Sequence, residues 1–309
     1  MADNRPLTVI YLAGWGRSGS TVVGSLLGQM PQAAYIGELW NLWEDAFVRD
    51  EFCGCTQRYS ECLFWQETLD ASGIDAERGK RLSALKFANL GSRSMLLGRS
   101  RLRRSIESGA MREYRHATAQ ILRETAKRLD ADVLIDASKT PNMLEVYAQM
   151  KDVAVKVLHI VRDPRAVAYS WYHRDKQRGP APGGGKMGRH HPARSTASWM
   201  ARNWMVSSGV RQLGQPYQRL LYEDFAASPD ECLSSALASF NLPTLDLAKS
   251  GDMQANRHSI RGNPVRFEQQ PIAIRADEAW RDEMPKLEKL VVTAMATPML
   301  ACYGYPIIA

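Results

Sequence analysis

Apolar, β-branched segments alternate along the chain with segments whose apolar residues recur at helical spacing. Such alternation is typical of an α/β fold, in which helices cross over between the strands of a parallel sheet. The first strand is expected at Leu7–Ala13 and is followed by a helix at Val22–Met30. Further core strands are expected at Val133–Asp136, Val153–Val161 and Tyr217–Tyr222. The pattern predicts a three-layer, P-loop-like fold with a central parallel sheet flanked by helices.

Three stretches extend this plan. Residues from about 79 to 129 are mostly helical in pattern and form an insert between the first two core strands. Residues from about 178 to 192 are rich in glycine and proline and lack periodic apolar positions, which is typical of a mobile lid. Because regular patterning resumes at Ser195, we expect this lid to belong to a single domain that spans residues 1–309. A last helix, at about Asp277 to Ala296, is expected to pack on the sheet.

Bulk composition narrows the class of protein. The net charge of +7 is compatible with an anionic ligand, but the basic residues are spread over 309 positions, so no nucleic-acid partner is expected. No apolar run approaches the roughly 20 residues that span a bilayer, and the amino-terminal residues lack the apolar segment of a signal peptide. These features predict a cytoplasmic enzyme without a transmembrane segment, and they leave a homo-oligomer open.

The five cysteines are too few and too scattered for a secreted disulfide framework. Three of them, Cys53, Cys55 and Cys62, nevertheless lie close together in the sequence. Their spacing matches no common zinc finger, and no histidine is near them in the sequence. A local disulfide or buried thiols are therefore favoured over a zinc site, and no metal is expected.

The most informative motif follows the first predicted strand and reads Gly14-Trp-Gly-Arg-Ser-Gly-Ser-Thr21. A glycine-rich turn between a strand and a helix points backbone N–H groups at one spot and so cradles an anion. Ser20 stands where a P-loop NTPase has the lysine that reaches the β- and γ-phosphates. The loop is therefore expected to hold a phosphate, with Arg17 as its fixed positive charge, but not a triphosphate with magnesium.

A second motif, at the end of a later buried strand, reads Arg162-Asp-Pro-Arg-Ala-Val-Ala-Tyr-Ser170. Asp163 suits the N-cap of a helix, and Pro164 suits its first turn. Arg162 lies just past the carboxyl end of the strand, where open α/β sheets bind ligands. Arg162 and Ser170 could both donate to one phosphate. The alternative is a structural Arg–Asp pair beside a surface serine.

Together the two motifs resemble those of the sulfotransferase superfamily, whose members use 3′-phosphoadenosine 5′-phosphosulfate (PAPS). Further segments are similar to its bacterial and Golgi carbohydrate branches. They are Gly37-Glu-Leu-Trp40, the cysteine segment at 53–65, Asp136-Ala-Ser-Lys-Thr-Pro141, Leu221-Tyr-Glu-Asp224 and His258-Ser-Ile-Arg-Gly-Asn-Pro-Val-Arg-Phe267. The resemblance runs in the expected order from about residue 7 to residue 267. It is specific for the fold and the cofactor, and it does not identify the acceptor.

The resemblance implies a set of residues that bind the donor. They are Arg17, Ser18, Gly19, Ser20, Thr21, Ser138, Arg162, Ser170, Tyr222, Arg261, Gly262 and Asn263. The glycine loop would cradle the 5′-phosphosulfate, while Arg162 and Ser170 would hold the 3′-phosphate through charge-assisted hydrogen bonds. The segment Arg261–Asn263 would close over the nucleotide. Tyr222, placed at the end of a strand, would lie near the adenosine or else be a core aromatic. Adenosine 3′,5′-bisphosphate (PAP) would be the spent cofactor.

Sulfuryl transfer needs a base for the acceptor hydroxyl and positive charge for the leaving phosphate oxygen. Glu38 is the expected base, because it follows a short apolar run, Ala33 to Ile36, and can lie at a strand end beside the glycine loop. Lys139, in a segment similar to the Asp-x-Ser-Lys motif of the family, is expected to stabilise the leaving oxygen together with Arg17. The alternative bases are His173, His190 and His191.

Two other functions compete with a PAPS-dependent sulfotransferase. A P-loop kinase or NTPase is disfavoured because Ser20 replaces the lysine and no Walker B acid clearly follows a core strand. A non-catalytic nucleotide-binding or scaffold protein is disfavoured because both phosphate motifs occur together with Glu38 and Lys139. The acceptor is expected to present a hydroxyl on a small molecule, a glycan or a lipid, and the sequence does not choose among these.

Overall fold

A computed structural model of the chain describes residues 6–91, 99–174, 188–245, 258–267, 274 and 276–308. Five strands form one sheet in the order β2-β3-β1-β4-β5, and every neighbouring pair is parallel. The strands are β1 (Leu7–Gly14), β2 (Ala33–Gly37), β3 (Val133–Lys139), β4 (Val153–Val161) and β5 (Tyr217–Leu221). The predicted α/β fold with a parallel sheet flanked by helices is confirmed.

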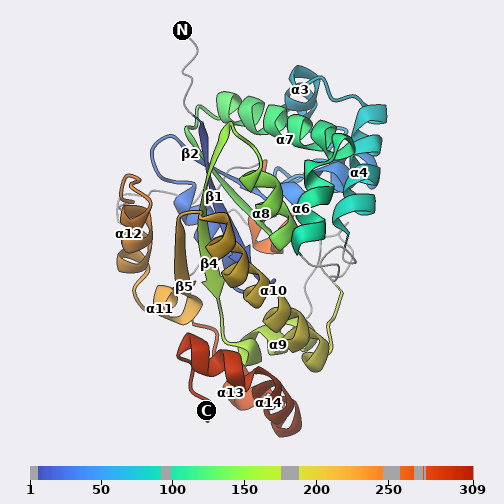
Figure 1. Cartoon of the computed structure of the whole chain (residues 1–309). Coiled ribbons are helices and arrows are strands. Elements are labelled where there is room, and N and C mark those ends of the chain that lie inside the picture. Colours follow the sequence, from blue (N-terminus) through green and yellow to red (C-terminus); the bar gives the residue numbers. More distant parts are fainter. Residues whose placement is uncertain are drawn as a thin grey trace.

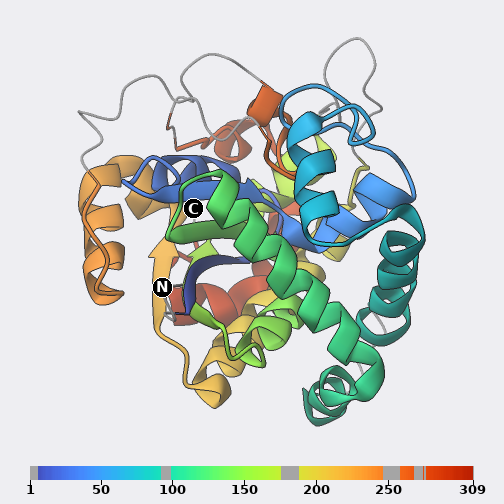
Figure 2. The same ribbon diagram turned by 90° about the horizontal axis from the view of Figure 1, so that it is seen from above.

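Helices cover both faces of the sheet and one of its ends (Figure 1). One face carries α1 (Ser20–Leu27), α11 (Tyr222–Ala227) and α12 (Pro229–Ser239). The other carries α2 (Leu42–Phe47), α3 (Leu63–Ala71), α4 (Ala76–Leu90), α6 (Arg99–Glu107), α7 (Gly109–Arg128), α8 (Pro141–Ala148) and α10 (Pro192–Leu213). Beyond the carboxyl end of β4 lie α9 (Pro164–Tyr172), α13 (Trp280–Glu283) and α14 (Lys286–Tyr303). Seen from above, α4 and α6 lie on the opposite side of the molecule from α12 (Figure 2).

The central strand β1 is buried on both faces. Val9 and Tyr11 join the apolar cluster formed with α7, α8 and α10, whereas Ile10 and Leu12 join the cluster formed with α1, α11 and α12. Successive side chains of a strand point to opposite faces, so a strand covered on both faces is a continuous apolar run in the sequence. This is why the core strands could be predicted from short apolar segments.

Some boundaries differ from those expected. The strand expected to reach Tyr222 ends at Leu221, and Tyr222 begins α11. The single helix expected from Asp277 to Ala296 is wrong, because the chain forms α13 and α14, and Met284 adopts an extended conformation before Pro285 between them. A proline ring clashes with a preceding helical turn, which explains the break. Helix α14 packs mainly against α9 and α10, and its end also contacts the sheet, where Tyr303 lies against His159 of β4 and Arg219 of β5.

Two further expectations concern the lid and the membrane. Residues 178–187 of the expected lid lie outside the described part of the chain, and α10 already begins at Pro192. Among the described helices, none combines the length and the apolar character that a membrane crossing requires.

Candidate active site

Three neighbouring strands end at one cavity of about 370 Å³. Strand β1 leads into the glycine loop, β2 leads into Glu38, and β3 ends at Lys139. Because parallel strands end on the same edge of a sheet, this strand order brings three distant motifs together. The expected site residues that line the cavity are Arg17, Gly19, Ser20, Thr21, Glu38, Ser138, Lys139, Arg261, Gly262 and Asn263.

The glycine loop holds a charge and a hydroxyl beside the first turn of α1. Gly19 precedes α1 with a φ of +86°, and a Cβ at this position would overlap the ring of Tyr222. The Arg17 guanidinium lies over the ring of Trp171, 4.7 Å from its centroid. Burial lowers the pKa of Arg17 to about 10, so the group stays charged at neutral pH. The buried Ser18 hydroxyl has no hydrogen-bond partner in the described part of the chain, and Ser18 belongs to the lining of neither cavity.

Glu38 and Lys139 form an ion pair on the cavity wall. The Lys139 ammonium donates to Glu38 Oε1 at 2.6 Å and to the carbonyl of Ala137 at 2.7 Å. Asn41 donates to the other carboxylate oxygen of Glu38 at 2.9 Å. Lys139 also has a φ of +62°, a left-handed conformation that costs a residue with a Cβ about 1–2 kcal/mol. The surrounding structure therefore imposes this backbone conformation.

Asp136 joins the ends of β2 and β3 and was not assigned a role from the sequence. Its carboxylate accepts hydrogen bonds from the Leu39 N–H at 3.2 Å, the Ser138 hydroxyl at 2.6 Å and the Tyr147 hydroxyl at 2.7 Å. Ser138 in turn accepts from the Trp40 N–H at 2.9 Å. Burial raises the pKa of Asp136 to about 6. The sequence did contain a signal for this role, namely an aspartate within an apolar strand. A carboxylate buried there requires hydrogen-bond donors around it.

The segment Ser259–Asn263 extends the edge of the sheet from far along the chain. Ile260 forms an isolated bridge with Gly37 at the end of β2. The Ile260 N–H donates to the Ile36 carbonyl at 2.9 Å, and the Glu38 N–H donates to the Ile260 carbonyl at 2.6 Å. The backbone of Glu38 is therefore held by a segment more than two hundred residues away in the sequence.

The same segment also contacts the glycine loop. The Asn263 N–H donates to the Thr21 hydroxyl at 3.2 Å, and Gly262 adopts a φ of +114° that favours glycine. The Arg261 guanidinium donates to Asp45 at 2.6 Å, so its charge is paired with a carboxylate of α2. Burial raises the pKa of Asp45 to about 6, against the opposing effect of Arg261.

Arg162 and Tyr222 line a second cavity, of about 250 Å³. The Arg162 guanidinium lies 4.9 Å from the centroid of the Tyr222 ring and donates to the carbonyls of Arg17 at 3.0 Å and Asp277 at 3.1 Å. The Tyr222 ring packs against Gly19. The second cavity therefore adjoins the glycine loop on the side of α11.

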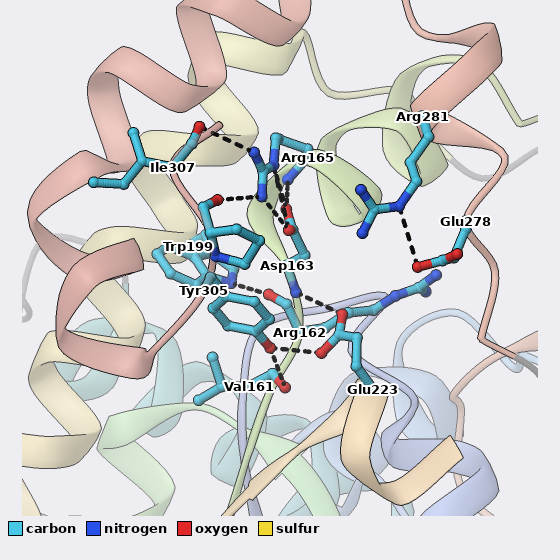
Figure 3. A network of polar contacts seen from close by, with 11 residues as sticks. Val161, Arg162, Asp163, Arg165, Trp199, Glu223, Glu278, Arg281, Tyr305 and Ile307 are labelled. Atoms are coloured by element: carbon cyan, nitrogen blue, oxygen red, sulfur yellow. Dashed lines mark hydrogen bonds and ion pairs between the residues drawn. The ribbon is translucent and has the colours of Figure 1, made fainter. Parts of the chain in front are cut away.

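A polar network holds the second motif in place (Figure 3). Asp163 pairs with the Arg165 guanidinium at 2.7 Å and accepts from the Arg165 N–H at 2.8 Å, which confirms it as the N-cap of α9. Glu223 accepts from the Asp163 N–H at 3.0 Å and from the Tyr305 hydroxyl at 2.6 Å. The structural Arg–Asp pair of this motif is thus Arg165–Asp163, and the Arg162 side chain remains directed at the second cavity.

Other expected residues lie away from the first cavity. Ser170 is buried within α9, and among the described residues it belongs to the lining of neither cavity. His173, at the end of α9, contacts Glu288 of α14 at 2.7 Å. His190 packs edge-on against Trp171, with ring centroids 4.4 Å apart, and burial lowers its pKa. Of the candidate bases among the described residues, Glu38 is therefore the one that lines the cavity.

Arg202, which was not predicted from the sequence, reaches the cavity from α10. Its guanidinium lies 4.7 Å from the centroid of the Trp15 ring, and burial lowers its pKa. An arginine on a long helix with a mixed surface gives no signal of its own in the sequence. The charged residues that line the cavity are Arg17, Lys139, Arg202, Arg261 and Arg266, against Glu38, Asp45 and Glu51. The excess of cations suits an anionic ligand.

The fold and these cavities define a nucleotide-binding α/β enzyme that lacks the P-loop lysine. The sulfotransferase domain family matches residues 7–203, and the chain belongs to this family. It is accordingly a PAPS-dependent sulfotransferase.

Two solved structures are similar over nearly the whole chain. One is the sulfotransferase domain from the Synechococcus PCC 7002 olefin synthase, with 17% identity, a TM-score of 0.51 and coverage of 99% of this chain and 98% of that chain. The other is the sulfotransferase domain from the curacin biosynthetic pathway, with 18% identity, a TM-score of 0.50 and coverage of 98% of both chains. At these identities the likeness concerns the fold. No curated protein matches the chain in sequence.

Proposed function

We propose that the enzyme transfers the sulfuryl group of PAPS in line to a hydroxyl of a small molecule, a glycan or a lipid. One observation carries the proposal: Glu38 and Lys139 lie 2.6 Å apart on the wall of the cavity that the glycine loop also lines. A base and a cation are thus placed beside an anion cradle, as transfer to a hydroxyl requires. The apolar parts of the wall that would receive the acceptor come from Trp15, Trp40 and Trp171.

The residues of the first cavity suit the donor, because cations outnumber carboxylates on its wall. The second cavity offers Arg162 and Arg281 beside five carboxylates, and Arg162 lies 3.8 Å from that of Asp277. The loop from Arg17 to Thr21 would hold the 5′-phosphosulfate through backbone N–H groups and hydroxyls. Ser18, which lines neither cavity, stays a prediction for this group. Arg162 in the adjoining cavity would hold the 3′-phosphate, with Tyr222 beside the adenosine. The segment Arg261–Asn263 would close the nucleotide site. Ser170, buried in α9, stays a prediction for the 3′-phosphate.

Each polar side chain has one task in the proposed reaction. PAPS, when bound, supplies the activated sulfuryl group. Glu38 would accept the proton of the acceptor hydroxyl, because its carboxylate is held in place by Lys139 and Asn41. Lys139 and Arg17 would place positive charge beside the leaving phosphate oxygen. Asp136 acts through the backbone and Ser138, and so fixes the ends of the two strands that carry Glu38 and Lys139.

Calorimetric titration tests the donor site. We expect PAP to bind with micromolar affinity, about −8 kcal/mol, and ATP with magnesium to bind far more weakly. The physical reason is that Ser20 stands in place of the lysine that a triphosphate requires, whereas Arg162 offers a contact for a 3′-phosphate. Tight binding of ATP without binding of PAP would contradict the proposed donor and favour a kinase-like protein.

The Arg162→Ala variant tests the assignment of the 3′-phosphate. A charge-assisted hydrogen bond contributes about 1.5–3 kcal/mol, so the affinity for PAP should fall about 10–100-fold. The affinity for adenosine 5′-phosphate, which lacks only the 3′-phosphate, should change little. Arg162 also donates to the Arg17 carbonyl, so its loss could disturb the glycine loop. Titration with both nucleotides controls for this effect, because a disturbed loop would weaken the binding of both. A loss of equal size for the two nucleotides would mean that Arg162 merely supports the loop.

A further inference from the structure

We propose that Cys53, Cys55, Cys62 and His258 bind one zinc ion, which holds the end of strand β2 in place. The three sulfurs and one imidazole nitrogen all lie within 4.8 Å of one another. His258 follows Cys62 by 196 residues, and so the fold brings the set together. No histidine is close to these cysteines in the sequence, as stated above, but in the folded chain His258 lies beside them.

The distances between the four ligand atoms fit a single tetrahedral ion. With zinc–sulfur bonds of about 2.3 Å, the sulfurs of a tetrahedral site lie about 3.8 Å apart. The sulfurs of Cys55 and Cys62 are 3.6 Å apart. The Nδ1 atom of His258 lies 3.8 Å from the sulfur of Cys53 and 3.3 Å from that of Cys62. Three thiolates and one imidazole favour zinc over magnesium or calcium, which prefer oxygen ligands.

A disulfide does not account for the cluster. All five cysteines lie within the described residues, and none of them is bonded to another. The sulfurs of Cys55 and Cys62 are too far apart for the roughly 2.05 Å of a disulfide bond. The expectation of a local disulfide is therefore wrong for this structure. Cys53 and Cys62 are buried, which suits ligands of a closed structural site.

The chain around the cluster fixes the direction of the ligands. The ring of Phe64 stacks on that of His258, with centroids 4.5 Å apart and planes 11° apart. The Trp65 indole donates to the His258 carbonyl at 2.9 Å. The Gly54 N–H donates to the carbonyl of Ser259 at 3.1 Å. Contacts of this kind around metal ligands set their orientation and raise metal affinity.

One arginine balances the charge that the site would carry. Three thiolates and a divalent zinc leave one net negative charge. The Arg266 guanidinium donates to the Phe52 carbonyl at 2.9 Å and to the Ser259 carbonyl at 3.0 Å. These carbonyls belong to the neighbours of Cys53 and His258, so a positive charge lies beside two of the ligands.

The position of the cluster indicates its task. Four protein ligands complete a tetrahedron and leave no open position for substrate, which is typical of a structural zinc. His258 lies two residues before Ile260, which pairs with Gly37 and accepts from the Glu38 N–H. The ion would thus tie the loop from Cys53 to Cys62 to the segment that holds the backbone of Glu38.

Metal analysis of the full chain tests the proposal without any assay of sulfuryl transfer. The protein, purified from zinc-supplemented cells without chelators, should contain about one zinc per chain by mass spectrometry. The variants Cys62→Ser and His258→Gln should lose most of this zinc. Cys232→Ser and Cys302→Ser, which lie outside the cluster, serve as matched controls and should retain it.

A second measurement covers the case in which the ligand variants do not fold. The wild-type protein, stripped of metal and reduced, should take up one equivalent of cobalt(II) with the charge-transfer and d–d bands of a tetrahedral thiolate site, and zinc should displace it. Wild-type protein that takes up neither ion after reduction overturns the proposal, as does zinc binding that survives in both ligand variants. Failure of PAP to bind would leave this metal result unaffected, so the two proposals fail separately.

Discussion

Replacing Lys139 with alanine is expected to lower kcat by about 10²–10³-fold, the cost measured when one group that stabilises a developing oxyanion is removed. The ammonium lies in the cavity beside Glu38 and the glycine loop, where low exposure strengthens its field. The affinity for PAP should change little, because Arg17, Arg162 and the N–H groups of the glycine loop still bind its phosphates. Steady-state kinetics and calorimetric titration of the same preparation check both parts.

The left-handed backbone of Lys139 allows stability and catalysis to be separated. A Lys139→Gly variant removes the ammonium as completely as Lys139→Ala does. It also removes the Cβ and with it the strain of a φ of +62°. We therefore expect Lys139→Gly to be about 1 kcal/mol more stable than Lys139→Ala in denaturant unfolding, with an equally low kcat.

The control for these variants is Lys127→Ala, which removes a lysine from an exposed ion pair with Glu124. Its kcat should equal that of the wild type. Recovery of turnover in the Lys139→Gly variant would indicate that backbone strain at residue 139, and not loss of the ammonium, causes the low kcat of Lys139→Ala. Added alkylamine, in contrast, should restore some turnover to Lys139→Gly only if the missing charge is the cause.

The sequence predicted those parts of the site that lie at strand ends. Arg17, Glu38 and Lys139 each follow a short apolar run, and parallel strands necessarily end at one edge of their sheet. Arg162 also follows a strand, β4. This strand lies on the side of β1 away from β2 and β3, and Arg162 therefore lines the adjoining cavity. Local pattern and sheet geometry together were therefore sufficient to place these four charged residues at one edge of the sheet, whereas their roles rest on the family resemblance and stay predictions.

The residues that were missed reach the site through long-range packing. Arg202 depends on how α10 lies against its neighbours, and His258 depends on the bridge between Ile260 and Gly37. No periodicity in the sequence encodes either contact. Asp136 differs, because a carboxylate inside an apolar strand is itself a signal that donors must surround it. The break at Pro285 was also visible in the sequence, since proline restricts the residue before it.

Replacing Glu38 with glutamine is expected to lower kcat for an alcohol acceptor by about 10²–10⁴-fold, the range for loss of a general base. The amide has nearly the same shape as the carboxylate and can still accept from Lys139 or from Asn41. It cannot take up the proton of the hydroxyl at neutral pH. PAP titration should give an affinity close to that of the wild type. A matched control is Glu107→Gln, which alters an exposed carboxylate paired with Arg103 at 3.1 Å.

Acceptors of different acidity decide whether Glu38 acts as a base or only positions Lys139. A general base contributes most when the acceptor hydroxyl holds its proton tightly, and little when the hydroxyl is already ionised. The rate loss in Glu38→Gln should therefore be large for an alcohol and should shrink steadily along a series of increasingly acidic phenols. A loss that is the same for every acceptor would assign Glu38 to positioning. Near wild-type turnover with the alcohol would transfer the base role to His190, whose ring packs against the cavity residue Trp171.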